Sequence, residues 1–164
     1  MQTISLHRSH FNSPLGNITM VASPKGLSGL WFEDQKHLPD VEQWPLDHHH
    51  PILVQAHTKI SHYFNDCQKK LDIPIDFIWG TDFQQKVWHA LIQIPYGKYV
   101  TYSQLAQHLE MPNASRAVGA AVGRNPISLI VPCHRVMGQN GQLTGYAGGL
   151  WRKTDLLQRE GVLC

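Results

Sequence analysis

Residues 101–136 have the sequence TYSQLAQHLEMPNASRAVGAAVGRNPISLIVPCHRV, in which two short helical patterns precede an apolar run. Thr101 with Gln104 three residues later is a capping box, which predicts a helix start there, and Pro112 predicts its end. A second helix should follow at once, with a small-residue apolar face. That face is predicted to contain Ala114, Ala117, Val118, Ala121 and Val122. Two short helices joined by a tight turn predict a helix-turn-helix, although helical hairpins without DNA partners share this pattern.

The apolar residues 127–131 predict a buried strand, or the approach to one, that leads into Pro132-Cys133-His134-Arg135-Val136. Proline restricts its own backbone and that of its predecessor, so Cys133 is expected in a stiff turn. Its polar and cationic neighbours should lower the pKa of the thiol. His134 could activate the thiol where the chain bends or through water, with Glu160 as a candidate to orient the imidazole. The alternatives are a metal ligand, for which no second cysteine lies nearby, and a buried structural cysteine.

The flanking segments predict two domains, residues 1–80 and 81–164. In the first, strand-forming segments 2–8, 17–22 and 26–32 alternate with Ser-Pro turns, which predicts an antiparallel meander. A helix should follow, with a further short strand at 75–79. The apolar positions of that helix are Leu53, Ala56, Ile60, Tyr63 and Phe64. In the second domain, Thr81 and Gln84 form another capping box, and the helix that begins there should end before Pro95.

Composition limits the class of protein. Of 164 residues, 42% are hydrophobic and 16% charged, which is typical of a globular protein, and no run of eighteen apolar residues occurs. We therefore expect a cytoplasmic protein with no membrane partner. Cys67, Cys133 and Cys164 are an odd number without close pairing, so at least one free thiol is expected.

Charge is unevenly divided along the chain. Residues 1–80 carry six Lys/Arg and eight Asp/Glu, whereas residues 81–164 carry eight and four, so the halves have net charges of −2 and +4. An excess in the second half is what a phosphate-facing surface would need, although an ordinary solvated surface explains it about as well.

With these residues in view, the second half resembles the methylated-DNA-protein-cysteine methyltransferases, also called O6-alkylguanine-DNA alkyltransferases. Pro132-Cys133-His134-Arg135-Val136 matches the active-site signature of that family. Further matches at the family's spacing are Tyr102, Arg116 in Ser115-Arg116-Ala117-Val118-Gly119, Asn125-Pro126, Gly145-Tyr146-Ala147-Gly148-Gly149 and Glu160-Gly161. The first half resembles the family more weakly, chiefly through Ser13-Pro14-Leu15-Gly16.

The resemblance implies a fold of class α+β, with a small ribonuclease-H-like N-terminal α/β domain that has an antiparallel sheet, and a C-terminal winged helix-turn-helix domain. It also implies single-turnover DNA repair, in which an alkyl group passes from O6-alkylguanine in double-stranded DNA to Cys133 after base flipping, with O4-alkylthymine as a second candidate substrate. No cofactor is implied, and we expect a monomer.

Residue roles follow from the same resemblance. The implied catalytic residues are Cys133, His134, Glu160 and Asn125, where Asn125 holds the active-site turn. The implied substrate- or DNA-binding residues are Tyr102, Arg116, Arg135, Val136, Tyr146, Ala147, Gly148 and Lys153. Tyr102 would press on the backbone beside the lesion, and Arg116 would fill the space left by the rotated nucleotide.

Some features depart from the family or leave other functions open. A zinc site found in some members has no counterpart at Ile4, Ser23 and Ser28, so no metal is predicted there. The residues His48, His49, His50, His57, His62 and Cys67 offer another metal cluster, but their spacing suits a polar loop better. The competing functions are a non-catalytic binder of alkylated DNA, a helix-turn-helix regulator and a thiol hydrolase, of which the first normally lacks the cysteine.

Overall fold

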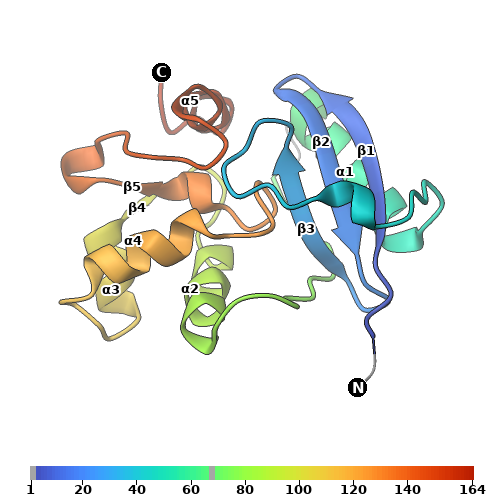
Figure 1. The fold of residues 1–164 in the computed structure, drawn as a ribbon. Helices are drawn as coiled ribbons and strands as arrows, with labels where there is room; N and C mark the ends of the chain where they lie inside the picture. Colours follow the sequence, from blue (N-terminus) through green and yellow to red (C-terminus); the bar gives the residue numbers. More distant parts are fainter. Residues whose placement is uncertain (1–2, 67–68) are drawn as a thin grey trace. The chain divides into compact units, whose positions relative to one another are not determined.

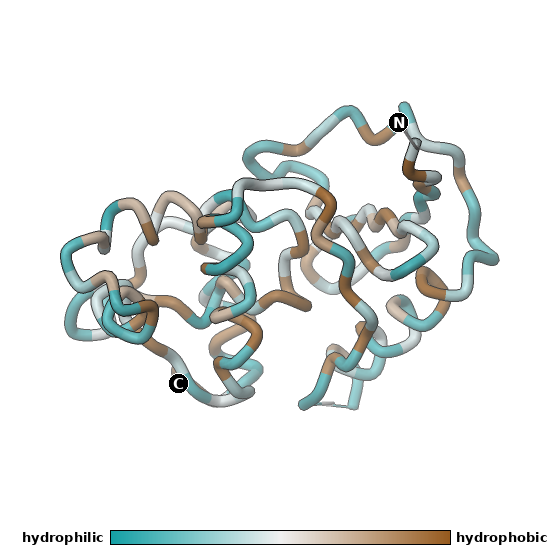
Figure 2. Tube along the Cα trace, turned by 90° about the horizontal axis from the view of Figure 1, so that it is seen from below, coloured by the Kyte–Doolittle hydropathy of each residue, from teal (hydrophilic) through white to brown (hydrophobic). Residues whose placement is uncertain are grey.

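The computed structural model describes residues 3–66 and 69–164, and the chain forms two compact units that meet in sequence at Ile78 and Trp79 (Figure 1). Each unit has its own hydrophobic core. No helix within the described residues is long and apolar enough to cross a membrane. Hydrophobic and hydrophilic residues instead alternate over short stretches of the trace (Figure 2), as they do when each helix or strand buries one face.

The first unit is an antiparallel meander with a helix packed on it. Strands β1 (His7–Ser13), β2 (Gly16–Ala22) and β3 (Leu27–Phe32) lie in the order β1-β2-β3, and the 3-10 helix η1 (Val41–Gln43) precedes α1 (Pro51–Asp66). All five apolar positions predicted for α1 are buried. The Ser13 hydroxyl accepts a hydrogen bond from the Leu15 amide at 3.1 Å and so closes the first turn. The meander and its helix are therefore confirmed.

Two of the predicted strands in this unit were wrong. The first strand is His7–Ser13 rather than residues 2–8, because backbone pairing outweighs the polar side chains of that segment. No strand forms at residues 75–79. Ile75 makes only an isolated bridge to Leu27, since the preceding residue is Pro74, which lacks the N–H needed to extend the ladder.

The second unit is mainly helical. It contains α2 (Asp82–Ile92), β4 (Val100–Thr101), α3 (Tyr102–His108), α4 (Ser115–Gly123), η2 (Cys133–Arg135), β5 (Val136–Met137), η3 (Gln139–Gly141) and α5 (Leu150–Arg159). Both predicted capping boxes are present, at Thr81 and Thr101. The indole of Trp88 on α2 donates to the carbonyl of Ala121 on α4 at 2.8 Å. The helix-turn-helix α3–α4 is thereby held against α2.

Two details of the second unit differ from the sequence predictions. Ala117 is exposed on α4, where only Val118, Ala121 and Val122 of the predicted apolar face are buried. Residues 127–131 are buried as predicted, but of the two predicted alternatives, a strand or the approach to one, the strand does not form: the residues make turns, and Leu129 has a φ of 71°. The apolar run therefore anchors the segment before Cys133 by burial, while the strand contact is made later, where β4 pairs with β5.

Candidate active site and DNA-binding surface

Cys133 begins the 3-10 helix η2 in a turn that Asn125 holds. The Asn125 amide donates to the carbonyl of Val131 at 2.8 Å and of Ile127 at 3.4 Å, and its oxygen accepts from the amide of Ile127 at 3.0 Å. The amide of Cys133 itself donates to the carbonyl of Val131 at 2.8 Å. Cys133 is 5% exposed, so its sulfur is held in one place in the core of the second unit.

His134, Arg135 and Glu160 form a buried polar network beside this turn. Glu160 accepts from Nε2 of His134 at 2.8 Å, and from Nε and Nη2 of Arg135 at 2.7 and 3.1 Å. Arg135 also donates through Nη1 to the carbonyl of Ile94 at 2.7 Å. A buried carboxylate with its pKa lowered is ionised and can only accept, so Nε2 of His134 must carry a proton.

The other nitrogen of this imidazole is different. Nδ1 of His134 is buried and has no hydrogen-bond partner in the described part of the chain. Because Nε2 carries the proton, Nδ1 of the neutral ring has a free lone pair. An unsatisfied buried acceptor costs about 1–3 kcal/mol, so its retention calls for a functional reason.

Lys153 on α5 is also fully buried. Its ammonium donates to the carbonyl oxygens of Val136 at 2.6 Å, Thr144 at 2.9 Å and Gly145 at 3.4 Å. These carbonyls belong to two separate segments, the one that follows η2 and the loop before α5. Lys153 therefore ties the Cys133 turn to that loop.

The environment shifts the pKa values of these groups in different directions. Burial raises the pKa of the Cys133 thiol, although hydrogen bonding by Asn125 and the charge of Lys153 partly oppose the shift. The prediction of a lowered thiol pKa was thus wrong, because desolvation outweighs the cationic neighbours. Burial lowers the pKa of His134, so the ring is neutral at pH 7, and it lowers the pKa of Lys153 to about 8. Burial alone would raise the pKa of Glu160, but its bonds to His134 and Arg135 lower it to about 2.

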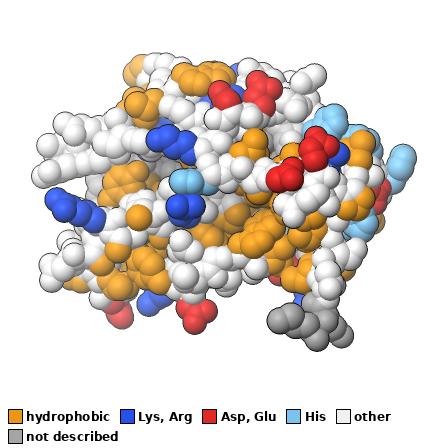
Figure 3. Space-filling view, viewed as in Figure 1, with side chains coloured by type: hydrophobic (Ala, Val, Ile, Leu, Met, Phe, Trp, Pro, Cys, Tyr) orange, Lys and Arg blue, Asp and Glu red, His pale blue; other side chains and the backbone are white. Residues whose placement is uncertain are grey.

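The predicted DNA-contacting residues lie on α3, α4 and the loop before α5. Tyr102 and Arg116 line an open pocket of about 370 Å³ together with Ser115, Gly119, Thr144 and Gly145. Exposed residues on α4 are either cationic or small. The small side chains allow another backbone to approach the helix closely. The exposed residues are Arg116, Ala117, Ala120 and Gly123, and the exposed Arg124 follows them as the C-cap. Figure 3 shows separate Lys and Arg side chains in this region and no broad cationic patch.

The loop before α5 holds three more of the predicted substrate-binding residues. Tyr146 and Ala147 are half-buried and Gly148 is buried, with its carbonyl accepting from Nη1 of Arg152 at 2.9 Å. Gly149, at a φ of 92°, precedes the first residue of α5 in a conformation that favours glycine.

Three predicted residues lie elsewhere than on a DNA-facing surface, and one of them, Val136, is fully buried in β5. The side chains of Arg135 and Lys153 are buried and bind Glu160 and backbone carbonyls respectively. Arg152 is buried as well, so three of the eight cations in residues 81–164 cannot meet phosphates directly. Sequence reasoning also missed Thr144 and the carbonyl of Ile94, because neither residue type carries a catalytic signal.

No group of three or more His, Cys, Asp or Glu that could hold a metal ion occurs in residues 3–66 and 69–164. The rings of His7 and His50 lie 5.5 Å apart, as do those of His10 and His48. The possible ligand Cys67 lies outside the described residues.

A helix-turn-helix beside a buried cysteine and a histidine–carboxylate pair is the arrangement of a DNA-modifying protein that uses a thiol. Comparison identifies the class further. Residues 6–77 match the family model described as the ribonuclease-like domain of 6-O-methylguanine DNA methyltransferase, and residues 82–162 match its DNA binding domain. The chain belongs to this family.

Individual relatives agree with the family models. The chain is 41% identical over 155 residues to a methylated-DNA–protein-cysteine methyltransferase of Mycobacterium tuberculosis, covering 94% of this chain and 92% of the relative. It is 36% identical over 161 residues to the Haemophilus influenzae protein of the same name, covering 96% and 88%. A crystal structure of the M. tuberculosis protein in complex with DNA matches with a TM-score of 0.86 at 40% identity, covering 95% of this chain and 93% of that one.

Membership confirms the predicted two-domain fold and the predicted function class. The chain is a DNA-repair methyltransferase that acts by direct transfer of an alkyl group from DNA to protein.

Proposed function

We propose that Cys133 is the acceptor, and that it takes the alkyl group from O6-alkylguanine in double-stranded DNA after the base has left the helix stack. The observation that carries this proposal is the orientation of His134. Nε2 donates to Glu160 at 2.8 Å, and Nδ1 is buried with an unused lone pair. An adjacent neutral imidazole, itself oriented by a carboxylate, is the arrangement that activates a weak nucleophile.

The proposed reaction balances as follows. His134 takes the proton of the Cys133 thiol at Nδ1, directly or through a water molecule, and Glu160 stabilises the resulting imidazolium. The thiolate sulfur attacks the alkyl carbon in line, so an S–C bond forms as the bond between carbon and O6 breaks. The electron pair of the broken bond goes to guanine, which takes up one proton as it leaves, so that the proton removed from the thiol by His134 is balanced by the proton that guanine gains. The thioether cannot return to a thiolate, so each molecule acts once.

Burial of Cys133 supports base flipping as the route to the sulfur. A thiol that is 5% exposed cannot reach an O6 substituent inside a duplex, whereas an extruded base can enter a pocket. The pocket edge formed by Tyr102 and Arg116 supports their proposed roles on the DNA backbone and in the vacated stack.

We assign the recognition of guanine to the loop before α5 and to the strand after η2. The amide of Ala147 and the hydroxyl of Tyr102 are proposed donors to the base, and the carbonyl of Val136 is a proposed acceptor from its exocyclic amine. Tyr146 would form the pocket wall, and Gly148 would leave room for the loop backbone beside it.

Arg135 and Lys153 are proposed as positioning residues rather than as DNA contacts. Arg135 holds Glu160 through two hydrogen bonds, and Lys153 holds the Val136 carbonyl at 2.6 Å. Each acts on the reaction through the group it holds.

A monomer in the cytoplasm fits this chemistry. All the proposed catalytic residues come from one chain, and the free thiol of Cys133 would survive best in a reducing compartment.

The test is to mix equimolar protein with a duplex that carries O6-methylguanine and to measure intact and peptide masses. One methyl adduct on Cys133, and none in Cys133→Ala, is expected. Binding of the lesion without an adduct would overturn the proposal in favour of a non-catalytic binder. Binding that does not prefer the lesion would instead point to a helix-turn-helix regulator.

A further inference from the structure

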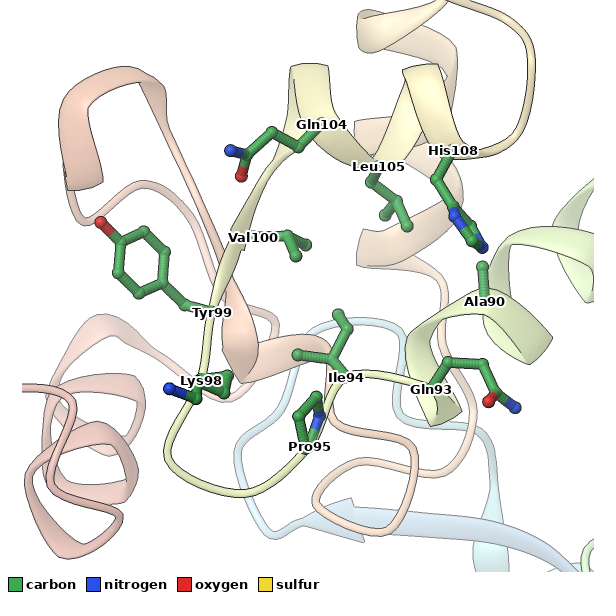
Figure 4. Close-up of a pocket in the computed structure, with 10 residues that line it drawn as sticks. All are labelled: Ala90, Gln93, Ile94, Pro95, Lys98, Tyr99, Val100, Gln104, Leu105 and His108. Atoms are coloured by element: carbon green, nitrogen blue, oxygen red, sulfur yellow. The ribbon is translucent and has the colours of Figure 1, made fainter.

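A second cavity in the C-terminal unit has no part in the proposed reaction. It has a volume of about 450 Å³ and lies between the end of α2, the segment before β4, and α3. Figure 4 shows the side chains of Ile94, Val100 and Leu105 pointing into its centre, with Ala90 facing them from α2. Small-molecule sites usually have volumes of about 300–1,000 Å³ and mainly apolar walls, so this cavity has the size and lining of a ligand site.

Charge at the rim narrows the class of ligand. Lys98 and His108 are exposed at opposite edges of the cavity (Figure 4), and none of the residues that line it is Asp or Glu. Lys98 makes no ion pair with another described residue. A small apolar body with an anionic group therefore complements the site, because the body fills the apolar centre and the anion meets the ammonium of Lys98.

One wall of the cavity is shared with the active-site network. The Ile94 side chain lines the cavity, while its carbonyl accepts from Nη1 of Arg135 at 2.7 Å. Two residues on, the ring of Tyr96 lies 5.8 Å from the guanidinium carbon of Arg135, and its hydroxyl donates to the carbonyl of Arg159 at 3.0 Å. A displacement of residues 94–96 would therefore move Arg135, and with it Glu160.

A second wall is tied to the active-site turn through backbone pairing. Val100 lines the cavity and pairs with Val136 in the parallel β4–β5 contact. Val136 follows η2 directly, and its carbonyl is the one that Lys153 holds. A ligand that pushes Val100 outward would therefore also act on the segment that carries Cys133.

We propose that this cavity binds a small aromatic anion, and that its occupancy slows alkyl transfer by displacing Ile94 and loosening the hold of Arg135 on Glu160. The second clause rests on the proposed role of the His134–Glu160 pair. Binding in the cavity itself is independent of that role, so the two parts are tested separately.

The binding test uses 1-naphthoate as the probe. Its binding to the full chain is monitored through amide chemical shifts and measured by calorimetry. Shifts should concentrate at residues 90–108. Ala90→Phe, which fills the cavity, should abolish binding, and Lys98→Glu should weaken it about three- to tenfold by reversing one exposed charge. Lys86→Glu is the matched control, because it reverses a charge on the exposed face of α2 outside the cavity, and it should leave binding unchanged. Absence of binding, or equal binding by wild type and Ala90→Phe with both folded, overturns the site.

The coupling test measures the single-turnover rate of methyl transfer. The protein is in saturating excess over the duplex that carries O6-methylguanine, so that a change in DNA affinity does not alter the rate. Saturating 1-naphthoate should slow wild type and Lys86→Glu at least about fivefold, the lower range of typical coupling between sites, and should leave Ala90→Phe unaffected. Unchanged wild-type rates overturn the coupling. If wild type does not transfer the methyl group even in the absence of 1-naphthoate, that result instead counts against the proposed function.

Discussion

Replacing Glu160 by Gln should destabilise the protein by about 3 kcal/mol at pH 7. The side chain of Glu160 is 0% exposed and accepts from His134 at 2.8 Å and from Arg135 at 2.7 and 3.1 Å. Removing one partner of a buried ion pair costs about 3–5 kcal/mol, because it leaves the other charge without compensation. The amide oxygen of Gln still accepts one bond, which returns about 1 kcal/mol.

The pH dependence of the free energy of unfolding gives an independent measure of the contribution of Glu160. The bonds of Glu160 lower its pKa from 4.5 to about 2, and this difference corresponds to about 3 kcal/mol. A carboxyl whose folded pKa is lowered contributes stability that is fully present above pH 4.5 and is lost as the pH falls toward 2. The deficit of Glu160→Gln should therefore be constant from pH 7 to 5 and shrink below that range.

Urea unfolding followed by tryptophan fluorescence at pH 7, 5, 4 and 3.5 measures this deficit. Asp155→Asn on α5 is the control, since its pair with Arg159 is about one third exposed and should contribute less than about 1 kcal/mol. A deficit for Glu160→Gln that is no larger than that of Asp155→Asn at pH 7 would refute the account of the network. A deficit that persists undiminished at pH 3.5 would refute the assignment of its pH dependence to this carboxyl.

Three other substitutions separate DNA contact, turn geometry and thiol chemistry. Arg116→Ala removes an exposed side chain. Repair of the lesion duplex should weaken, while the rate of thiol alkylation by iodoacetamide should stay that of wild type. Full repair by this variant would exclude the proposed role of Arg116 in the stack. Asn125→Ala leaves the buried carbonyl of Val131 and the amide of Ile127 without their side-chain partner. The free energy of unfolding, measured in urea, should therefore fall by about 2–4 kcal/mol. A loss under about 1 kcal/mol would contradict the role of Asn125 in the turn. Lys153→Met removes a positive charge that lowers the pKa of Cys133, so the pH midpoint of iodoacetamide alkylation should rise, and an unchanged midpoint would show that Lys153 acts on the backbone alone. The stability of wild type relative to Lys153→Met should also rise as the pH increases from about 8 toward 10.5, because burial lowers the pKa of the lysine and the unfolded chain binds its proton more tightly.

Local features of the fold were predictable from the sequence, because short-range interactions determine them. The capping boxes at Thr81 and Thr101 need only residues three positions apart, and both helices begin as predicted. The Ser13 turn is local in the same sense. By contrast, His7–Ser13 carries little strand signal of its own, and its pairing with β2 and with Pro45 determines where the strand lies.

Long-range parts of the site were less predictable. Glu160 could be named as a candidate to orient His134, but spacing in sequence did not show that Arg135 would take the same carboxylate from the other side. The cationic residues around Cys133 suggested a lowered thiol pKa. Desolvation reverses that shift, and desolvation depends on burial in three dimensions rather than on which residues are adjacent.

The raised pKa of Cys133 suits its proposed role as an acceptor that is used once. At neutral pH the buried sulfur is held mainly as a thiol, and a thiol reacts poorly with oxidants and with free alkylating agents. In the proposed reaction His134 takes the proton as transfer begins, and Glu160 is already in place to stabilise the resulting charge. An exposed thiolate would react faster with any alkyl donor, and each such reaction would remove one protein molecule from repair. In the proposed reaction, burial reserves the sulfur for a base delivered into the pocket, and the histidine–carboxylate pair supplies there the activation that burial takes away.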